Sequence, residues 1–157
     1  KDGHGMGSAS DDDAYFLGRL PYIAARGGCD RKRVACLLVD PETGDILGRG
    51  RNTSLFGLPT CDQVGHLLRD NHCRRSLHAE VAALADARLS GDRLVGATAY
   101  LTVNPCYNCF NMLVLFGVER IVFAEAYPGE GLDDVFQAVR DLRAAGYPIE
   151  LVGPGAP

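Results

Sequence analysis

The chain has no apolar run long enough to cross a membrane and no excess of basic charge. None of its 157 residues fall in an apolar stretch of about 18 residues, the length that a transmembrane helix needs. No signal-like apolar segment is present either. The formal net charge of −4 argues against strong nonspecific binding to nucleic acid, because that binding depends on Lys and Arg neutralising phosphates. A local basic patch is still compatible with this charge, but we expect no membrane or nucleic-acid partner.

The chain also lacks internal repeats and any linker between domains. Hydrophobic residues make up 46% and charged residues 23%, as is usual for one soluble globular domain of this length. Residues 1–10 are rich in Gly and Ser, show no apolar pattern and do not start with Met, so we expect a disordered segment or a cloning remnant. The sequence therefore predicts a single domain over residues 11–157.

Six cysteines could form the disulfides of a secreted protein. Four of them, however, lie near a His or in C-x-x-C spacing, and a chain of this length does not need cross-links for stability. We therefore expect zinc ligands in a reducing compartment, the cytoplasm. Cys36 lies inside an apolar strand and is expected to be a core residue.

Apolar periodicity and turn residues predict four helices and five strands. In chain order these are helix 14–26, strands 34–39 and 46–51, helix 77–89, strand 99–103, helix 106–116, strand 120–124, helix 132–145 and strand 149–152. The expected core-facing residues are Phe16, Leu20, Ile23 and Ala24 on the first helix, Val81, Leu84 and Ala85 on the second, and Leu132, Val135, Phe136, Val139 and Leu142 on the last. This order predicts one mixed sheet with helices on both faces and parallel strand-helix-strand units.

Two motifs on predicted helices carry the chemistry. His78-Ala79-Glu80 opens one helix, and Pro105-Cys106-Tyr107-Asn108-Cys109 opens the next. Cysteines three apart lie on one helical face, and a helix N-terminus favours thiolate. We predict that His78, Cys106 and Cys109 bind zinc and leave its fourth position for water, as in a catalytic zinc site.

Glu80 lies two residues from the proposed ligand His78 and is the expected catalytic residue. Its carboxylate would take a proton from water, give it to the ring nitrogen beside the reacting carbon, and later protonate the leaving ammonia. The alternative is a structural zinc with Glu80 as a solvated helix residue. H-x-E followed by P-C-x-x-C is the motif pair of zinc deaminases, which favours the catalytic interpretation.

Over about residues 29–127 the chain resembles the cytidine/deoxycytidylate deaminase superfamily, and within it the deoxycytidylate (dCMP) deaminases. The resemblance implies an α/β fold: a three-layer α/β/α cytidine-deaminase-like domain with a five-stranded mixed sheet. It implies zinc-dependent hydrolytic deamination of a cytosine nucleotide, dCMP to dUMP plus ammonia. Three other functions stay open: deamination of a nucleoside, modified nucleotide or free base such as guanine; editing like that of tRNA adenosine deaminases; and a non-catalytic zinc-binding module.

The polar connection of about residues 52–77 is long for a structureless loop, and a second metal would explain its order. Cys29, Cys61 and Cys73 resemble cysteines that hold a structural zinc in some dCMP deaminases. His66 is the favoured fourth ligand, with His72 as the alternative, and the set would be a tetrahedral Cys3His site. The other interpretation is that these are polar-loop thiols and that Cys29 is buried.

The same resemblance suggests substrate contacts and partners. The residues implied in substrate binding are Asn52, Ser54, Arg75, Ala79 and Tyr127. Departures from the family pattern, which leave the substrate open, are Arg51, Thr53, Ala82 and Asn104. The resemblance also implies a homo-oligomer such as a hexamer, and regulation by dCTP and dTTP with Mg²⁺.

Overall fold

The structure is a computed structural model that describes residues 11–25, 33–55, 57–70, 72–127 and 131–156. The segment 1–10 and Cys29, on which two of the predictions fall, lie outside these residues. In chain order the elements are α1 (Asp11–Ala24), β1 (Ala35–Val39), β2 (Ile46–Arg51), α2 (Cys61–Val64), β3 (Leu68–Arg69), β4 (His72–Cys73), α3 (Ala79–Leu89), β5 (Thr98–Val103), α4 (Tyr107–Leu115), β6 (Arg120–Glu125), α5 (Leu132–Ala144) and β7 (Glu150–Val152).

The centre of the molecule is a five-stranded mixed sheet in the order β2-β1-β5-β6-β7. β1 is antiparallel to both β2 and β5, whereas β5, β6 and β7 run parallel to one another. The predicted mixed sheet with parallel crossovers through α4 and α5 is therefore confirmed. Within the described residues, no helix is both long and apolar enough to cross a membrane.

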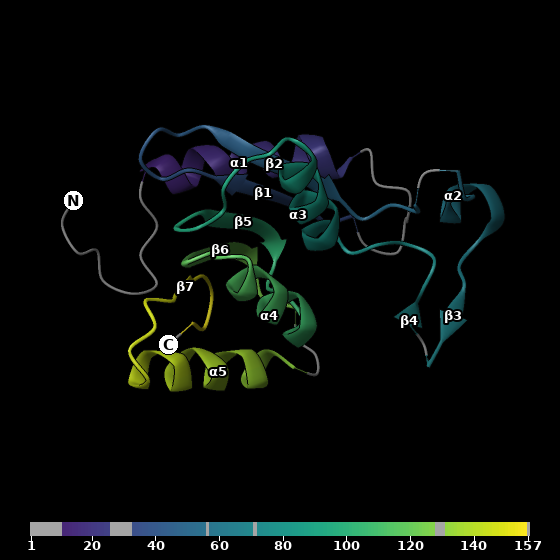
Figure 1. Cartoon of the computed structure of the whole chain (residues 1–157). Coiled ribbons are helices and arrows are strands. Elements are labelled where there is room, and N and C mark those ends of the chain that lie inside the picture. The colour runs from purple at the N-terminus through teal and green to yellow at the C-terminus, as the bar shows by residue number, and fades with distance from the viewer. Residues whose placement is uncertain (1–10, 26–32, 56, 71, 128–130, 157) are drawn as a thin grey trace.

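Helices cover both faces of the sheet, which makes three layers (Figure 1). α1 packs on one face through Phe16, Leu20 and Ala24, beside Tyr100 of β5. α3, α4 and α5 pack on the other face in a separate core. Because both faces are covered, every residue of β1 is buried, and Cys36 is a core residue as expected.

The prediction that Val81 and Ala85 lie on the core-facing side of α3 is wrong. Val81 is half-buried and Ala85 is exposed, while the buried residues are Ala79, Glu80, Ala83, Leu84 and Ala87. The reason is the close approach of α3 to β2, where glycines stand at positions 48 and 50. A Cβ on Gly50 would collide with the backbone of Ala79 and Ala83, and one on Gly48 would press on Ala83 and Ala87. Alanines of α3 therefore face the two glycines of β2 across this contact.

A buried carboxylate holds α1 to the end of the sheet at which β6 begins. Asp13 is fully buried and forms two hydrogen bonds of 2.7 Å with the guanidinium of Arg120, at the start of β6. The hydroxyl of Tyr100 donates a third, also of 2.7 Å. Arg120 in turn pairs with Glu150 of β7 at 3.2 Å. The network pairs the buried charge of Asp13 with Arg120 and Tyr100, and so holds α1 on the face of the sheet opposite α3.

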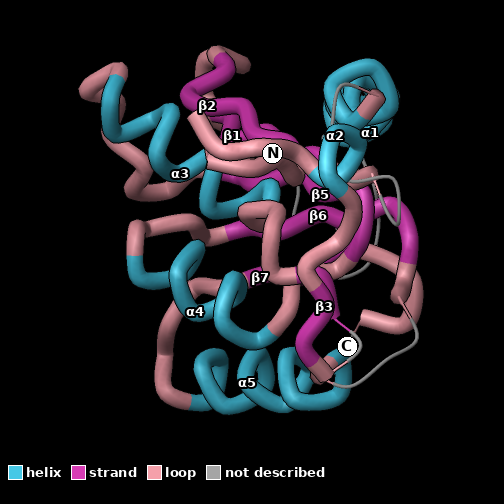
Figure 2. Tube along the Cα trace, turned by 90° about the vertical axis from the view of Figure 1, so that its right-hand side faces the viewer, coloured by secondary structure: helices cyan, strands magenta, loops and turns pink. Residues whose placement is uncertain are grey.

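The connection expected to be a metal-ordered loop carries local structure. α2 follows Thr60, which caps it in a capping box with Gln63, and β3 and β4 form a short antiparallel pair. Figure 1 shows α2, β3 and β4 projecting beyond the sheet, and Figure 2 views the molecule from that side. The chain rejoins the body at Leu77, whose N–H donates to the carbonyl of Thr53 at 2.7 Å.

Candidate active site

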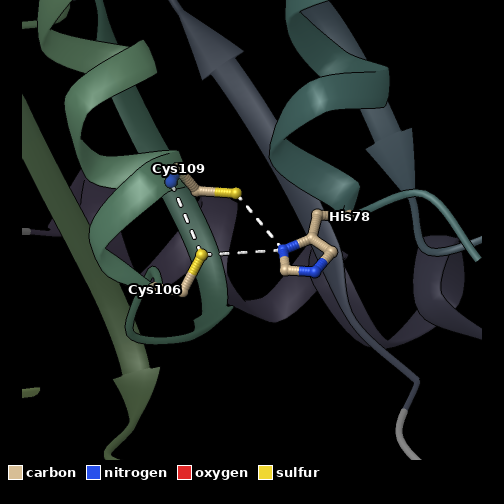
Figure 3. A group of neighbouring side chains, drawn as sticks. All are labelled: His78, Cys106 and Cys109. Atoms are coloured by element: carbon tan, nitrogen blue, oxygen red, sulfur yellow. Dashed lines mark hydrogen bonds between the residues drawn. The ribbon is translucent and has the colours of Figure 1, made fainter. Parts of the chain in front are cut away.

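The proposed ligands converge at the edge of the sheet where the parallel strands end. β5 ends at Val103, and Cys106 is the N-cap of the helix that follows, with Cys109 one turn on. His78 is the N-cap of α3. Figure 3 shows both sulfurs facing His78 from the first turn of α4. Open α/β sheets bind ligands at the carboxyl ends of their strands, so the site has the expected place in the fold.

The three side chains fit a zinc ion. Cys106 Sγ lies 3.7 Å and Cys109 Sγ 3.3 Å from Nδ1 of His78, and the three ligand atoms lie within 4.8 Å of one another. Tetrahedral zinc with bonds of about 2.3 Å to sulfur and 2.0–2.1 Å to nitrogen would set its sulfur and nitrogen ligands roughly 3.6 Å apart. Of the described residues, these are the ones that could hold a metal ion together. Three donors, with Cys106 exposed, match an open coordination sphere.

Without a metal, the thiols of Cys106 and Cys109 differ strongly in pKa. Hydrogen bonds from the Cys109 thiol, from His78 and from the Cys109 N–H lower the pKa of Cys106 to about 4, against the cost of burial. The neighbouring Cys106 in turn raises the pKa of Cys109 well above its ordinary value, and burial adds to this. His78 has a raised pKa, chiefly because it hydrogen-bonds Cys106, and burial opposes this. Without a metal the cluster therefore holds a thiolate on Cys106 and a thiol on Cys109.

Glu80 is buried beside this cluster. Only 5% of its surface is exposed, and burial raises the pKa of its carboxyl to about 7. A hydrogen bond with its own backbone N–H, the charge of His78 and a hydrogen bond with Cys109 act in the other direction. A buried carboxyl that hydrogen-bonds one of the proposed metal ligands is suited to proton transfer near neutral pH. The solvated-residue alternative for Glu80 does not fit this burial.

Three predicted substrate residues, two on the loop after β2 and one between β4 and α3, form hydrogen bonds with the backbone. Oδ1 of Asn52 accepts a hydrogen bond of 2.8 Å from the Val34 N–H. Ser54 is buried, and its hydroxyl donates to the Pro59 carbonyl at 2.8 Å. Nε of Arg75 donates to the Gly65 carbonyl at 3.0 Å, across the base of the projecting arm. Their proposed roles toward a substrate stay predictions.

Ala79 and Tyr127 lie at the same edge as the cluster. Ala79 is buried in the first turn of α3, between His78 and Glu80. Tyr127 follows β6 and is 58% exposed. Its N–H donates to Oδ1 of Asn104 at 2.6 Å. Asn104 was expected only as a departure from the family pattern, because its one signal in the sequence is an Asn directly before the Pro-Cys pair at a strand end.

The proposed second set of metal ligands is only partly within the described residues. Cys29 lies outside them, and the side chains of His72 and Cys73 are likewise not described. Cys61 is buried in α2, with its sulfur 3.9 Å from the Ser76 hydroxyl. His66 follows α2 by two residues. In the pairing of β3 and β4, Cys73 lies opposite Leu68, which is two residues from His66. The hairpin therefore brings the backbones of these two predicted ligands near each other.

Comparison with known proteins identifies the family. Residues 10–125 match the model of the cytidine and deoxycytidylate deaminase zinc-binding region. The deoxycytidylate deaminase of Mycobacterium phage D29 is 34% identical over 125 residues, which cover 74% of this chain and 96% of that protein. ComE operon protein 2 of Bacillus subtilis is 31% identical over 72% of this chain, which spans only 59% of its length.

Solved structures share the fold. The dCMP deaminase of cyanophage S-TIM5, solved with dCMP and dUMP, has a TM-score of 0.75 at 22% identity and covers 94% of this chain and 99% of its own. At this identity the likeness supports the predicted three-layer α/β/α fold. The matched zinc-binding region, residues 10–125, includes both motifs, at 78–80 and 105–109. The chain belongs to the cytidine and deoxycytidylate deaminase family.

Proposed function

We propose that this protein catalyses the zinc-dependent hydrolytic deamination of a cytosine nucleotide, dCMP to dUMP plus ammonia. The observation that carries the proposal is the convergence of His78, Cys106 and Cys109 beside the buried carboxyl of Glu80. The substrate class is supported by the D29 relative, a deoxycytidylate deaminase, and by the S-TIM5 enzyme solved with dCMP and dUMP. Nothing in the described residues favours one of the alternative functions over this one.

The chain's residues divide the work as follows. His78, Cys106 and Cys109 hold the metal, which when bound activates water as a nucleophile near neutral pH. Glu80 accepts the proton that the water loses and delivers it to the ring nitrogen beside the carbon under attack. The same carboxylate then takes the proton of the hydroxyl that has added to this carbon and passes it to the amino group, which leaves as ammonia while the hydroxyl oxygen becomes the carbonyl oxygen of the product. Burial of Glu80 favours its neutral form and so keeps each accepted proton available for delivery.

The nucleotide's sugar and phosphate are assigned to the loops beside the cluster. We assign Asn52 to the sugar or phosphate side, Tyr127 to the sugar or base, and Ser54 and Arg75 to the phosphate, with the buried Ala79 as a further substrate contact. Asn52 and Ser54 form hydrogen bonds with Val34 and Pro59, which limits the freedom of this loop and supports the assignment. Preorganised contacts of this kind lower the entropy cost of binding.

A second, structural zinc on Cys29, Cys61, Cys73 and His66, with His72 as the other candidate for the fourth ligand, belongs to the proposal. The short α2 and the two-residue strands β3 and β4 support it, because so little regular structure offers few contacts to hold an arm in place. Four protein ligands would make this a closed structural site, unlike the open one at His78.

From the family resemblance we also propose a homo-oligomer, as large as a hexamer, with dCTP and dTTP as effectors bound with Mg²⁺. Cys36, Cys106 and Cys109 are free thiols, which supports work in the reducing cytoplasm. Sedimentation velocity with and without each nucleotide tests the assembly. A monomer in all conditions would contradict it.

Ammonia release tests the function. The purified zinc protein is assayed with dCMP, deoxycytidine, cytosine and guanine at matched concentrations, with metal content measured on the same sample. We expect dCMP to have the highest kcat/KM, at least about tenfold above deoxycytidine, because phosphate contacts add binding energy. Faster turnover of any other member would move the function to that substrate. No ammonia from any of them would support a non-catalytic zinc module.

A further inference from the structure

Asn104 joins the segment that carries the metal ligands to the segment that carries Tyr127. It is the last residue before Pro105, directly after β5. Its N–H donates to the Glu125 carbonyl at 3.2 Å and so extends the ladder between β5 and β6 by one bond. Its side chain makes the next connection: Oδ1 accepts from the Tyr127 N–H at 2.6 Å. Asn104 thus hydrogen-bonds the neighbouring segment twice, at Glu125 through its backbone and at Tyr127 through its side chain.

The strand register puts the segment of Tyr127 beside the segment that leads to the metal ligands. Val103 pairs with Glu125 in the parallel ladder, and Tyr127 and Cys106 follow these two residues at the same edge of the sheet. β6 ends at Glu125, and beyond that point the backbone ladder no longer fixes the chain. The carboxamide of Asn104 supplies a bond just where the ladder stops. Asn104 is half-buried, whereas the Tyr127 ring is 58% exposed at the edge it lines.

We propose that Asn104 is a positioning residue that holds Tyr127 at the entrance of the active site and thereby sets the affinity for the nucleotide. It touches neither the reacting atoms nor the metal; it acts through the Tyr127 backbone. The inference rests on the proposed function in one respect, that Tyr127 packs against the sugar or base of a pyrimidine nucleotide. An amide side chain suits the place, because its oxygen accepts without bringing another negative charge toward Cys106 and Glu125.

The first test measures the anchor itself, independently of activity. Amide hydrogen exchange at Tyr127 is followed in the zinc protein, in Asn104→Ala and in Asn104→Asp, which keeps an acceptor oxygen. Asn111→Ala is the matched control, since Asn111 is exposed on α4 and makes no hydrogen bond through its side chain among the described residues. We expect exchange at Tyr127 to be at least about tenfold faster in Asn104→Ala, because its local opening becomes easier. Unchanged exchange would overturn the inference.

The second test asks whether Asn104 acts through Tyr127. Loss of one positioning hydrogen bond should raise KM for dCMP roughly five- to tenfold in Asn104→Ala, with kcat within about twofold. Asn104→Asp should recover most of the affinity. In a Tyr127→Ala background, Asn104→Ala should change KM no further, because the ring it positions is gone. Additive effects, or a fall in kcat with KM unchanged, would overturn the positioning role.

The outcome separates from that of the proposed function. If the wild type released no ammonia from dCMP, the proposed function would fail, and the same variant cycle would be measured as Kd for dUMP by calorimetry. Non-additive losses of dUMP affinity would then still support the role of Asn104. Full dUMP affinity in Asn104→Ala, or no dUMP binding by the wild type, would overturn it.

Discussion

Cys106 and Cys109 differ in burial and in charge, although both point toward His78. Cys106 is exposed, whereas Cys109, in the first turn of α4, is buried and hydrogen-bonds Glu80. The spacing of the two cysteines and of His78 and Glu80 could be predicted from the sequence, because a first helical turn places residues three apart on one face. The inequality of the two thiols could not, because it arises from burial and from the hydrogen bonds between the two helix starts.

This inequality predicts the reactivity of the metal-free protein. Because the pKa of Cys106 is lowered to about 4, its thiolate persists as the pH falls from 8 toward 5, and alkylation there should stay fast. Mass spectrometry of the chelated protein after iodoacetamide pulses should show Cys106 modified well before Cys109 at pH 6. Added zinc should protect both. The buried Cys36, whose pKa is raised by burial, is the internal control. Equal rates at Cys36 and Cys106 would contradict the assignment.

At the scale of elements, apolar periodicity succeeded where one helix face meets one sheet. Phe16, Leu20 and Ala24 of α1 and Val135 and Val139 of α5 are buried as predicted. It failed on α3, because the face of that helix is chosen by the glycines of β2 and not by the bulk of its own side chains. The burial of Asp13 could not be predicted either, because its partner Arg120 lies 107 residues away. Three acidic residues in a first turn are also typical of compensation of the helix dipole.

Close packing of β2 on α3 predicts opposite outcomes for two glycine substitutions. Gly50→Ala puts a Cβ against the backbone of Ala79 and Ala83, next to His78, and should destabilise the protein by about 1–3 kcal/mol. It should also weaken zinc binding, because α3 must shift. Gly18→Ala, in α1 with no atom near its new Cβ, should be neutral or stabilise by up to about 1 kcal/mol. Urea denaturation compares them, and equal stability of the two variants would show that the contact is not tight.

For the whole molecule, the alternation of helix and strand predicted a mixed three-layer domain, and β5-α4-β6 and β6-α5-β7 confirm it. The projecting arm of α2, β3 and β4 could not be predicted, because its strands are two residues long and carry no apolar alternation. The proposed second zinc would order this arm, and metal content is the direct measure of that proposal.

Two zinc sites predict a stepwise loss of metal. Elemental analysis should give about two zinc ions per wild-type chain, one per chain in His78→Ala and one in Cys61→Ala, since the sites share no ligand. His78→Ala should still lose thermal stability on chelation, because the arm's metal binds the folded state. A wild-type ratio near one, together with none in His78→Ala, would remove the second site.

The most direct test of the account is the substitution Glu80→Gln. The amide is nearly isosteric and uncharged, so the buried pocket and the ligands at His78, Cys106 and Cys109 should remain intact. The account predicts unchanged zinc content and dUMP affinity, with kcat for dCMP lowered about 10²–10⁴-fold because the proton carrier is lost. Turnover within a few-fold of the wild type at full zinc occupancy would contradict it.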